Sequence, residues 1–365
     1  MQSSNEMGFA ERGIAFRNRL IASPRFRRWL GRFPLTRGFV RRRAAAMFDI
    51  NAGFVYTQIA LAMVDTRMFD ALAAGPLSVA DAAQHGDLPE AGADRLLKAA
   101  ASLDLAERLR DGRYVLGERG AALHADPGIS AMIDHHRHLY LDLADPVALL
   151  RRGGGGGALA AYWGYARSDD PAASSGAAVG SYSTLMATSQ AMVAGQVTAA
   201  YDFSRHKRLL DVGGGEGVFV RAVRAATPRL DIAVFDLPAV AARAGDVPVH
   251  GGNFFEDALP TGFDLISLVR ILHDHDDETA MKLLRNIHAA LPPDGQLMIA
   301  EPMAGTRGSR AMGDGYFGMY LWAMGSGRPR TMQEIEAMLR SAGFTKMREI
   351  RTGLPLITRI ILAGR

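Results

Sequence analysis

A run of glycines directly after a short apolar segment constrains this chain more than any other feature. Residues 209–217 read Leu-Leu-Asp-Val-Gly-Gly-Gly-Glu-Gly. The apolar residues predict a buried strand. The glycines predict a sharply bent loop that a ligand can approach closely, because glycine has no Cβ and tolerates positive φ. Gly213, Gly215 and Gly217 are spaced G-x-G-x-G, which is tighter than the G-x-G-x-x-G loop that seats a dinucleotide pyrophosphate.

The composition is that of an ordinary soluble globular protein. The chain has 365 residues, of which 48% are apolar and 22% charged, and about 150 residues per domain allows two domains. It has no cysteine, which excludes disulfides and thiolate chemistry and fits a reducing cytoplasm. The polar, then arginine-rich N-terminus predicts no signal peptide. The absence of an uninterrupted apolar run of about 18 residues predicts no transmembrane helix.

Charge separates a basic arm, residues 1–45, from a mildly acidic remainder. The arm has eleven arginines against Glu6 and Glu11, a balance of +9, and the remainder has a balance of −5. Trp29 and Phe33 are interleaved with the arginines. Three interpretations stay open: contact with an anionic membrane surface, which this pattern favours, packing against a partner subunit, and nucleic-acid binding.

Residues 46–190 are predicted to form a mainly helical domain. The pattern indicates a helix over Asp65–Ala74, a helix that begins after Ser78, a helix over 89–102, and a hairpin over 105–116. This is the outline of a winged helix. Within the third helix, residues 93–99 have only two basic residues and one acidic residue, Asp94, whereas a DNA reader needs a basic polar face. Dimerisation and cover for a substrate are therefore favoured over DNA binding.

Residues 191–365 alternate strand and helix patterns, which predicts an α/β, doubly wound, Rossmann-like domain. Its helices are expected over Val218–Ala226 and Glu278–Leu291. The end of the chain is expected to form a closing antiparallel pair. The predicted strands are Leu209–Val212, Asp231–Phe235, Phe263–Leu272, Gln296–Ala300, Phe344–Arg351 and Leu356–Ala363.

Three further features concern a possible lid, a metal and an apolar ligand. Gly153–Gly157 and the Ser, Asp and Pro-rich stretch 168–176 predict a mobile connection that is either a surface loop or a lid. The sequence His135-His136-Arg137-His138 lacks the carboxylate and the spacing of a zinc site, so no metal is expected. The Met- and aromatic-rich helix predicted over 316–324 suits either core packing or an elongated apolar ligand.

Polar residues follow successive strands. Asp236 ends the second strand, 19 residues after Gly217, where a carboxylate can accept both hydroxyl hydrogens of a ribose. A helix cap is the alternative. Asn253 and Phe254 follow the third strand position, where an amide and an aromatic ring suit an adenine; a simple turn is the alternative.

His273 and Glu301 are the predicted catalytic pair. His273 is expected to end the fourth strand and Glu301 the next, and the carboxyl ends of neighbouring parallel strands lie side by side. A neutral imidazole can accept a proton from a substrate hydroxyl. An adjacent carboxylate orients that imidazole and stabilises its protonated form, as in a catalytic triad.

These segments together resemble the class I S-adenosylmethionine (SAM)-dependent O-methyltransferases of the plant caffeate and hydroxyindole type. The resemblance rests on residues 211–217, Phe235-Asp-Leu-Pro, Gly251-Gly-Asn-Phe-Phe, Arg270-Ile-Leu-His-Asp and Ala300-Glu-Pro. It implies a winged-helix-like dimerisation domain, a homodimer, SAM as methyl donor, His273 as general base and Glu301 as its partner. The implied cofactor-binding residues are Asp211, Gly213, Gly215, Gly217, Asp236, Leu237, Asn253, Phe254 and Arg270.

Two departures from the family pattern concern the site. Asn253 stands where the family usually has Asp. Met332 follows Arg330-Thr331 where plant members place a second acid, although Glu334 is near in sequence.

Within the family, Phe33-Pro-Leu-Thr, residues 48–58 and residues 319–331 resemble carotenoid O-methyltransferases of purple photosynthetic bacteria. The resemblance implies methylation of the tertiary hydroxyl of an acyclic hydroxycarotenoid. The alternatives are a phenolic or bacteriochlorophyll-precursor acceptor on the same fold, and a non-catalytic SAM-binding regulator.

Overall fold

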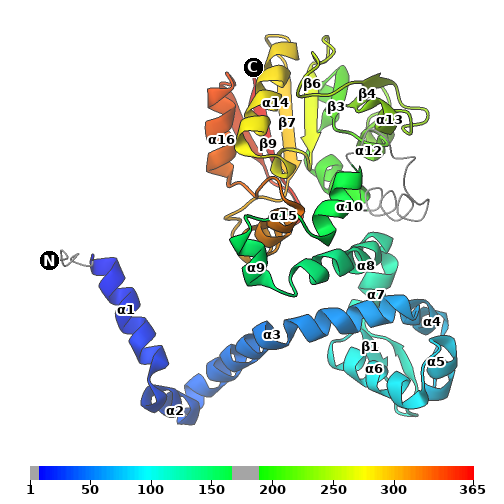
Figure 1. Cartoon of the computed structure of the whole chain (residues 1–365), viewed down its shortest axis with the longest axis vertical. Helices are drawn as coiled ribbons and strands as arrows, with labels where there is room; N and C mark the ends of the chain where they lie inside the picture. The colour runs from blue at the N-terminus through cyan, green and yellow to red at the C-terminus, as the bar shows by residue number, and fades with distance from the viewer. Residues whose placement is uncertain (1–7, 167–188) are drawn as a thin grey trace. The chain divides into compact units, whose positions relative to one another are not determined.

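The computed structural model describes residues 8–166 and 189–365. These form two compact units, Met1–Gly120 and Ala121–Arg365 (Figure 1). The first unit is helical with one small hairpin. Its elements are α1 (Phe9–Ala22), α2 (Pro24–Arg32), α3 (Pro34–Asp65), α4 (Met68–Ala74), α5 (Val79–His85), α6 (Glu90–Ser102), β1 (Ala106–Arg108) and β2 (Tyr114–Leu116). Helix α7 (Glu118–Ala125) crosses the boundary between the units.

The predicted winged-helix-like outline is confirmed in α4, α5, α6 and the hairpin. Ser78 caps α5, where its hydroxyl accepts a hydrogen bond from the Asp81 amide at 3.1 Å. One boundary was predicted wrongly. The helix expected from Asp65 begins at Met68, because Arg67 takes a left-handed conformation with φ of 50° and separates α3 from α4.

Helix α3 is long, and most of its surface is exposed although many of its residues are apolar. It has 32 residues, and an 18-residue window with a mean hydropathy of 1.3 is only 11% buried. By length and composition it could cross a membrane, which differs from the expectation of no such segment. The exposed apolar side chains in its middle include Met47, Phe48, Ile50 and Phe54.

The second unit is built on a seven-stranded sheet. Its order is β5-β4-β3-β6-β7-β9-β8, parallel from β5 to β7 and antiparallel for the last two strands. The Rossmann-like prediction and the closing antiparallel pair are therefore confirmed. The strands are β3 (Arg208–Val212), β4 (Asp231–Asp236), β5 (Val249–Gly251), β6 (Leu265–Val269), β7 (Gln296–Glu301), β8 (Lys346–Ile350) and β9 (Arg359–Gly364).

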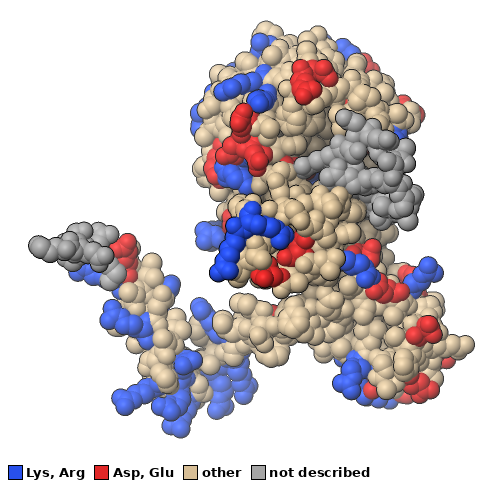
Figure 2. Space-filling view, viewed as in Figure 1, with Lys and Arg blue, Asp and Glu red and all other residues tan. Residues whose placement is uncertain are grey.

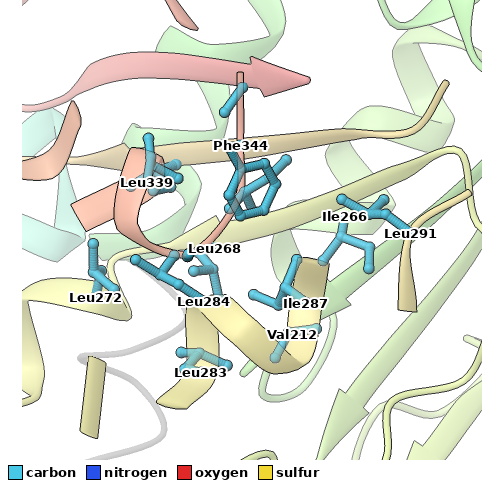
Figure 3. Close-up of a cluster of buried hydrophobic side chains, with 14 of the residues drawn as sticks. Val212, Ile266, Leu268, Leu272, Leu283, Leu284, Ile287, Leu291, Leu339 and Phe344 are labelled. Atoms are coloured by element: carbon cyan, nitrogen blue, oxygen red, sulfur yellow. The ribbon is translucent and has the colours of Figure 1, made fainter. Parts of the chain in front are cut away.

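Alternate strand residues enter two separate cores, because successive side chains point to opposite faces of a sheet. Leu210 and Val212 pack with α14 (Asp277–Ala290) and α16 (Met332–Ser341), as Figure 3 shows for Val212, Leu284 and Leu339. Leu209 packs on the other face with α12 (Val218–Ala226) and the helix over 189–200. Helix α13 (Pro238–Ala241) follows β4.

A third cluster lies beside the sheet domain's carboxyl edge. It contains side chains of α8 (Pro127–Asp142), α9 (Pro146–Arg151), α10 (Ala158–Ala166) and α15 (Gly318–Met324). Helix α15 directly follows a π-helical segment, Ala311–Phe317. The run Gly153–Gly157, expected to be mobile, is held here: the Gly155 amide donates to the Trp322 carbonyl at 2.9 Å. The stretch 168–176 lies outside the described residues.

Candidate functional site

The glycine loop leaves the carboxyl end of β3 in the conformation that its sequence predicts. Gly213, Gly215 and Gly217 have φ values of 73°, 58° and 79°. A Cβ at Gly213 would lie 2.5 Å from Ile271 Cδ1, so a side chain there would force Ile271 to shift and would be strained by the positive φ. Among the described residues, no heavy atom lies within 4 Å of the corresponding point at Gly215, so these residues leave the backbone open to a ligand there.

Asp211 is buried beneath this loop. It is 1% exposed, and its Oδ1 accepts a hydrogen bond from Ser267 Oγ at 2.6 Å. Its Oδ2 has no hydrogen-bond partner among the described residues. Burial, with a smaller effect from Asp236, raises the pKa of Asp211 to about 7 despite the bond from Ser267. A donor brought by a ligand would stabilise the charged carboxylate.

Asp236 ends β4 opposite the loop, as predicted. Its Oδ2 accepts the Gly215 amide at 2.8 Å and its Oδ1 accepts the Leu237 amide at 2.7 Å. Burial raises the pKa of Asp236, and these two amides oppose the rise. Asp211, Gly215, Asp236 and Leu237 are therefore brought together at one place on the sheet edge.

Asn253 lies in a turn, as the alternative to adenine binding predicted. One polar atom of its side chain can still contact a ligand. Its Oδ1 accepts the Phe255 amide at 3.0 Å. Phe254 packs edge-to-face on Phe255 with ring centroids 4.6 Å apart, and on His275 at 5.7 Å. These ring contacts hold the turn against the segment that follows β6. The side-chain amide nitrogen of Asn253 remains to recognise a ligand.

The strand that leads to His273 is shorter than predicted. β6 ends at Val269 rather than at Leu272, because Arg270 takes a left-handed conformation with φ of 58° and His273 lies in a 3₁₀ turn, Leu272–Asp274. Such a conformation costs a non-glycine residue about 1–3 kcal/mol. The Arg270 amide donates to the Ala300 carbonyl at 2.9 Å and its Nη1 donates to Ser189 Oγ at 2.8 Å.

His273 lies between two carboxylates. Its Nδ1 is 3.3 Å from Glu301 Oε2, and its Nε2 is 3.2 Å from Asp274 Oδ1. The His273 amide also donates to Glu301 Oε2 at 3.1 Å. His273 is 4% exposed and Glu301 is fully buried at the end of β7. The structure therefore brings together the pair predicted from sequence, and adds Asp274, which the sequence analysis did not assign to the site.

The charge of His273 follows from these neighbours. Burial lowers the pKa of the imidazole, but the carboxylates of Asp274 and Glu301 together outweigh burial and raise the pKa to about 9. The imidazolium is therefore the stable form at neutral pH. The ring contacts Phe317 at a centroid distance of 6.0 Å, so its surroundings are partly aromatic.

Arg330 is a residue that sequence analysis missed. It is fully buried, and it donates to the carbonyls of Leu272 and His275, both at 2.7 Å, and to Asp277 Oδ1 at 2.7 Å. It therefore clamps the turn that contains His273. The sequence signal was its place in the Arg330-Thr331 pair, to which the sequence analysis assigned no role.

Glu334 does not supply a second acid beside His273. Its Oε2 accepts the Thr331 amide at 2.8 Å and caps α16, and its Oε1 accepts Arg328 Nη1 at 2.7 Å. Met332, at the position of the family's second acid, is buried in the core. The second carboxylate on His273 is Asp274.

Histidines of α8 pair with tyrosines of the segment 316–320. His135 Nε2 lies 2.7 Å from the Tyr320 hydroxyl, and His136 Nε2 lies 2.6 Å from the Tyr316 hydroxyl. Trp163 Nε1 also donates to the Tyr320 hydroxyl at 2.9 Å. Burial, helped by the two neighbouring histidines, lowers the pKa of His135 to about 4. These neutral, aromatic groups form a largely apolar wall that reaches His273 through Phe317.

The site residues suit SAM. The open backbone at Gly215, the carboxylate of Asp236 and the unpartnered oxygen of Asp211 fit a ligand that presents hydroxyl and ammonium donors. An amide and an aromatic ring, from Asn253 and Phe254, lie on the turn after β5.

Comparisons with known proteins agree with this arrangement. The chain matches the O-methyltransferase domain family over residues 140–345 and the O-methyltransferase dimerisation domain family over residues 48–126. It is 42% identical to demethylspheroidene O-methyltransferase of Rhodobacter capsulatus, covering 96% of this chain and 90% of that protein. It is 40% identical to the protein of the same name from Cereibacter sphaeroides, covering 98% and 96%.

Solved structures show the same fold. Human N-acetylserotonin methyltransferase in complex with SAM superposes with a TM-score of 0.75 at 25% identity, covering 88% of this chain and 97% of that chain. The chain therefore belongs to the O-methyltransferase family and is a SAM-dependent O-methyltransferase with an N-terminal dimerisation domain.

Proposed function

We propose that this enzyme methylates the tertiary hydroxyl of an acyclic hydroxycarotenoid. The observation that carries the proposal is 40–42% identity, over nearly the whole chain, to two enzymes named for a demethylspheroidene acceptor. The aromatic wall of residues 316–320 is consistent with an apolar acceptor. We further propose a homodimer that works without a metal ion or nucleic acid, in the cytoplasm at the inner or photosynthetic membrane.

The proposed chemistry assigns one task to each residue. When bound, SAM supplies an electrophilic methyl group on a sulfonium sulfur. Asp236 and Leu237 would hold the ribose, with Asn253 and Phe254 at the adenine. Asp211, Gly213, Gly215, Gly217 and Arg270 would form the rest of the cofactor site.

On the acceptor side, neutral His273 would receive the hydroxyl proton at Nε2, after that atom exchanges its contact with Asp274 for the acceptor. Glu301, 3.3 Å from Nδ1, would stabilise the imidazolium that forms. The buried pair would thereby keep the proton away from water while the acceptor oxygen forms its bond to the methyl carbon. The bond from that carbon to the sulfonium sulfur would break in the same step, and its electron pair would stay on the sulfur, which leaves as a neutral thioether.

The acceptor is tested by methyl transfer from labelled SAM. The purified enzyme is given a 1-hydroxycarotenoid in liposomes, a bacteriochlorophyllide, or a simple phenol. We expect label in the carotenoid. Label confined to the phenol or the bacteriochlorophyllide would discard the carotenoid acceptor, and SAM binding without transfer to any of the three would point to an acceptor outside this set.

The protonation of His273 predicts a dependence of activity on pH. A general base must be neutral, and the pKa of His273 is raised to about 9 in the ligand-free enzyme. The value of kcat/KM for SAM, which reports ionisations of the free enzyme, should therefore rise with pH, with an inflection near pH 9, and level off only above that pH. In Asp274→Asn the imidazole loses one of the carboxylates that hold its proton, so the inflection should move to lower pH. An inflection that does not move in this variant would contradict the role assigned to Asp274.

A further inference from the structure

The N-terminal arm has no core of its own. Helices α1 and α2 contain no buried residue, although they carry large apolar side chains. Phe9 is 95% exposed, Phe16 63% and Trp29 57%. Apolar surface of this extent is normally covered by another surface, so the arm is suited to bind something outside this chain.

One face of the arm is an aromatic stack. The rings of Phe26 and Trp29 lie 6.0 Å apart and those of Trp29 and Phe33 lie 5.8 Å apart, with interplanar angles of 23° and 8°. Their spacing along α2 places them on one side of the helix. Aromatic rings, and tryptophan in particular, are enriched where a polar surface meets an apolar layer.

The rest of the same segment is strongly basic. Four arginines of α2, Arg25, Arg27, Arg28 and Arg32, form no ion pair with any carboxylate in residues 8–166 and 189–365. Arg41, Arg42 and Arg43 follow on α3. Glu11 is already engaged, because its Oε2 accepts the Gly8 amide at 2.9 Å. Figure 2 shows the resulting blue surface over α2 and the adjoining part of α3.

We propose that this arm binds the surface of an anionic lipid bilayer. The aromatic stack would enter the boundary between headgroups and acyl chains, and the arginines would pair with lipid phosphates. The arm of a second copy fits less well, because it would bring a second excess of +9 against the first, and the balance of −5 in the rest of the chain is spread over residues 46–365. Nucleic acid would neutralise the arginines but has no acyl layer to cover the exposed apolar side chains of α1.

The proposal extends the proposed function, because a carotenoid acceptor is dissolved in a membrane and the arm would bring the enzyme to it. Binding of the protein to vesicles is measured in the absence of methyl transfer, so that the membrane proposal and the acceptor proposal are tested independently. Full-length protein is sedimented with vesicles of phosphatidylcholine alone or mixed with phosphatidylglycerol. We expect binding to the anionic vesicles only, and loss of that binding as salt screens the charges.

Matched variants locate the binding surface. Neutralising the four arginines of α2 (Arg25→Gln, Arg27→Gln, Arg28→Gln and Arg32→Gln) should weaken binding by at least about tenfold. The control neutralises four exposed arginines outside the arm that form no ion pair within the described part of the chain, Arg110, Arg151, Arg229 and Arg285, and should bind like the unmodified protein. The double variant Trp29→Ser, Phe33→Ser should also bind more weakly.

Several outcomes would overturn the proposal. Equal weakening in the control would show that net charge alone matters, and equal binding to both vesicle types would remove the electrostatic argument. Absence of vesicle binding, with a change of oligomeric state or a loss of RNA binding in the α2 variant, would assign the arm to a partner subunit or to nucleic acid. If the arm binds vesicles but no carotenoid is methylated, the proposed acceptor is wrong and the proposal that the arm binds a membrane is kept.

Discussion

Replacing His273 with alanine is expected to reduce kcat by roughly 10²–10⁴, which is the contribution of a well-placed general base. The imidazole is 4% exposed and held between Glu301 and Asp274, so water cannot readily take over its function. SAM affinity should change little, because the residues assigned to the cofactor belong to other segments, apart from Arg270. The measurement is steady-state methyl transfer together with SAM binding by calorimetry.

Two comparisons make the His273 experiment specific. His85, an exposed histidine on α5, serves as the matched control, and His85→Ala should retain full activity. Glu301→Gln keeps the shape of the side chain but removes its charge, so it should lower kcat and also shift the pH profile towards lower pH. Near-full turnover in the His273 variant, with the fold intact, would refute the assignment of the base.

Replacing Arg330 with methionine is expected to lower the free energy of unfolding by about 2–5 kcal/mol. The change removes the guanidinium from the carbonyls of Leu272 and His275. The Leu272 carbonyl keeps only a 3.4 Å bond from the His275 amide, and a buried group that loses its partner costs about 1–3 kcal/mol. Loss of the ion pair with Asp277 contributes less to the destabilisation, because the Asp277 side chain is 57% exposed and solvent screens the pair. Denaturant unfolding measures the loss.

Arg328 provides the control for Arg330. It pairs with the same carboxylate, Asp277, and with Glu334, but its side chain is 43% exposed, so Arg328→Met should cost less than about 1 kcal/mol per exposed pair lost. The Arg330 variant should also lose activity under conditions where it is folded, because the turn that it clamps carries His273. Equal destabilisation by both substitutions would show that the buried clamp has no special role.

Sequence patterns predicted most of the sheet domain because its elements are encoded locally. The strands β3, β4 and β7 agree with the apolar runs within one residue, since a strand buried on both faces needs a continuous apolar segment. The glycine loop was equally predictable, because positive φ at three alternate positions leaves little choice other than glycine. Asp236 and Glu301 followed from these boundaries, since each ends a strand.

The element boundaries that were predicted wrongly are those at which a residue takes a backbone conformation that its type disfavours. Arg67 and Arg270 both take left-handed conformations, and nothing in their side chains favours such a backbone. At Arg270 the surroundings compensate, through bonds to Ala300 and Ser189 that join residues 30 and 81 positions apart. Asp274 was passed over as a site residue for the same reason: its distance from His273 Nε2 depends on the turn that Arg270 begins.

The sequence by itself determined the fold class, the site of the glycine loop, the identity of the His273 and Glu301 pair, and the basic arm. Each of these depends on residue types at short spacing, where backbone geometry and hydrophobic periodicity act directly. Tertiary structure alone decided the second carboxylate on His273, the Arg330 clamp and the pairing of His135 with Tyr320, 185 residues away. The clamp and the His135 pairing join remote segments, and the pKa of about 9 at His273 arises because the carboxylates of Asp274 and Glu301 outweigh burial. The distances that decide these effects depend on the folded backbone, which no local pattern encodes.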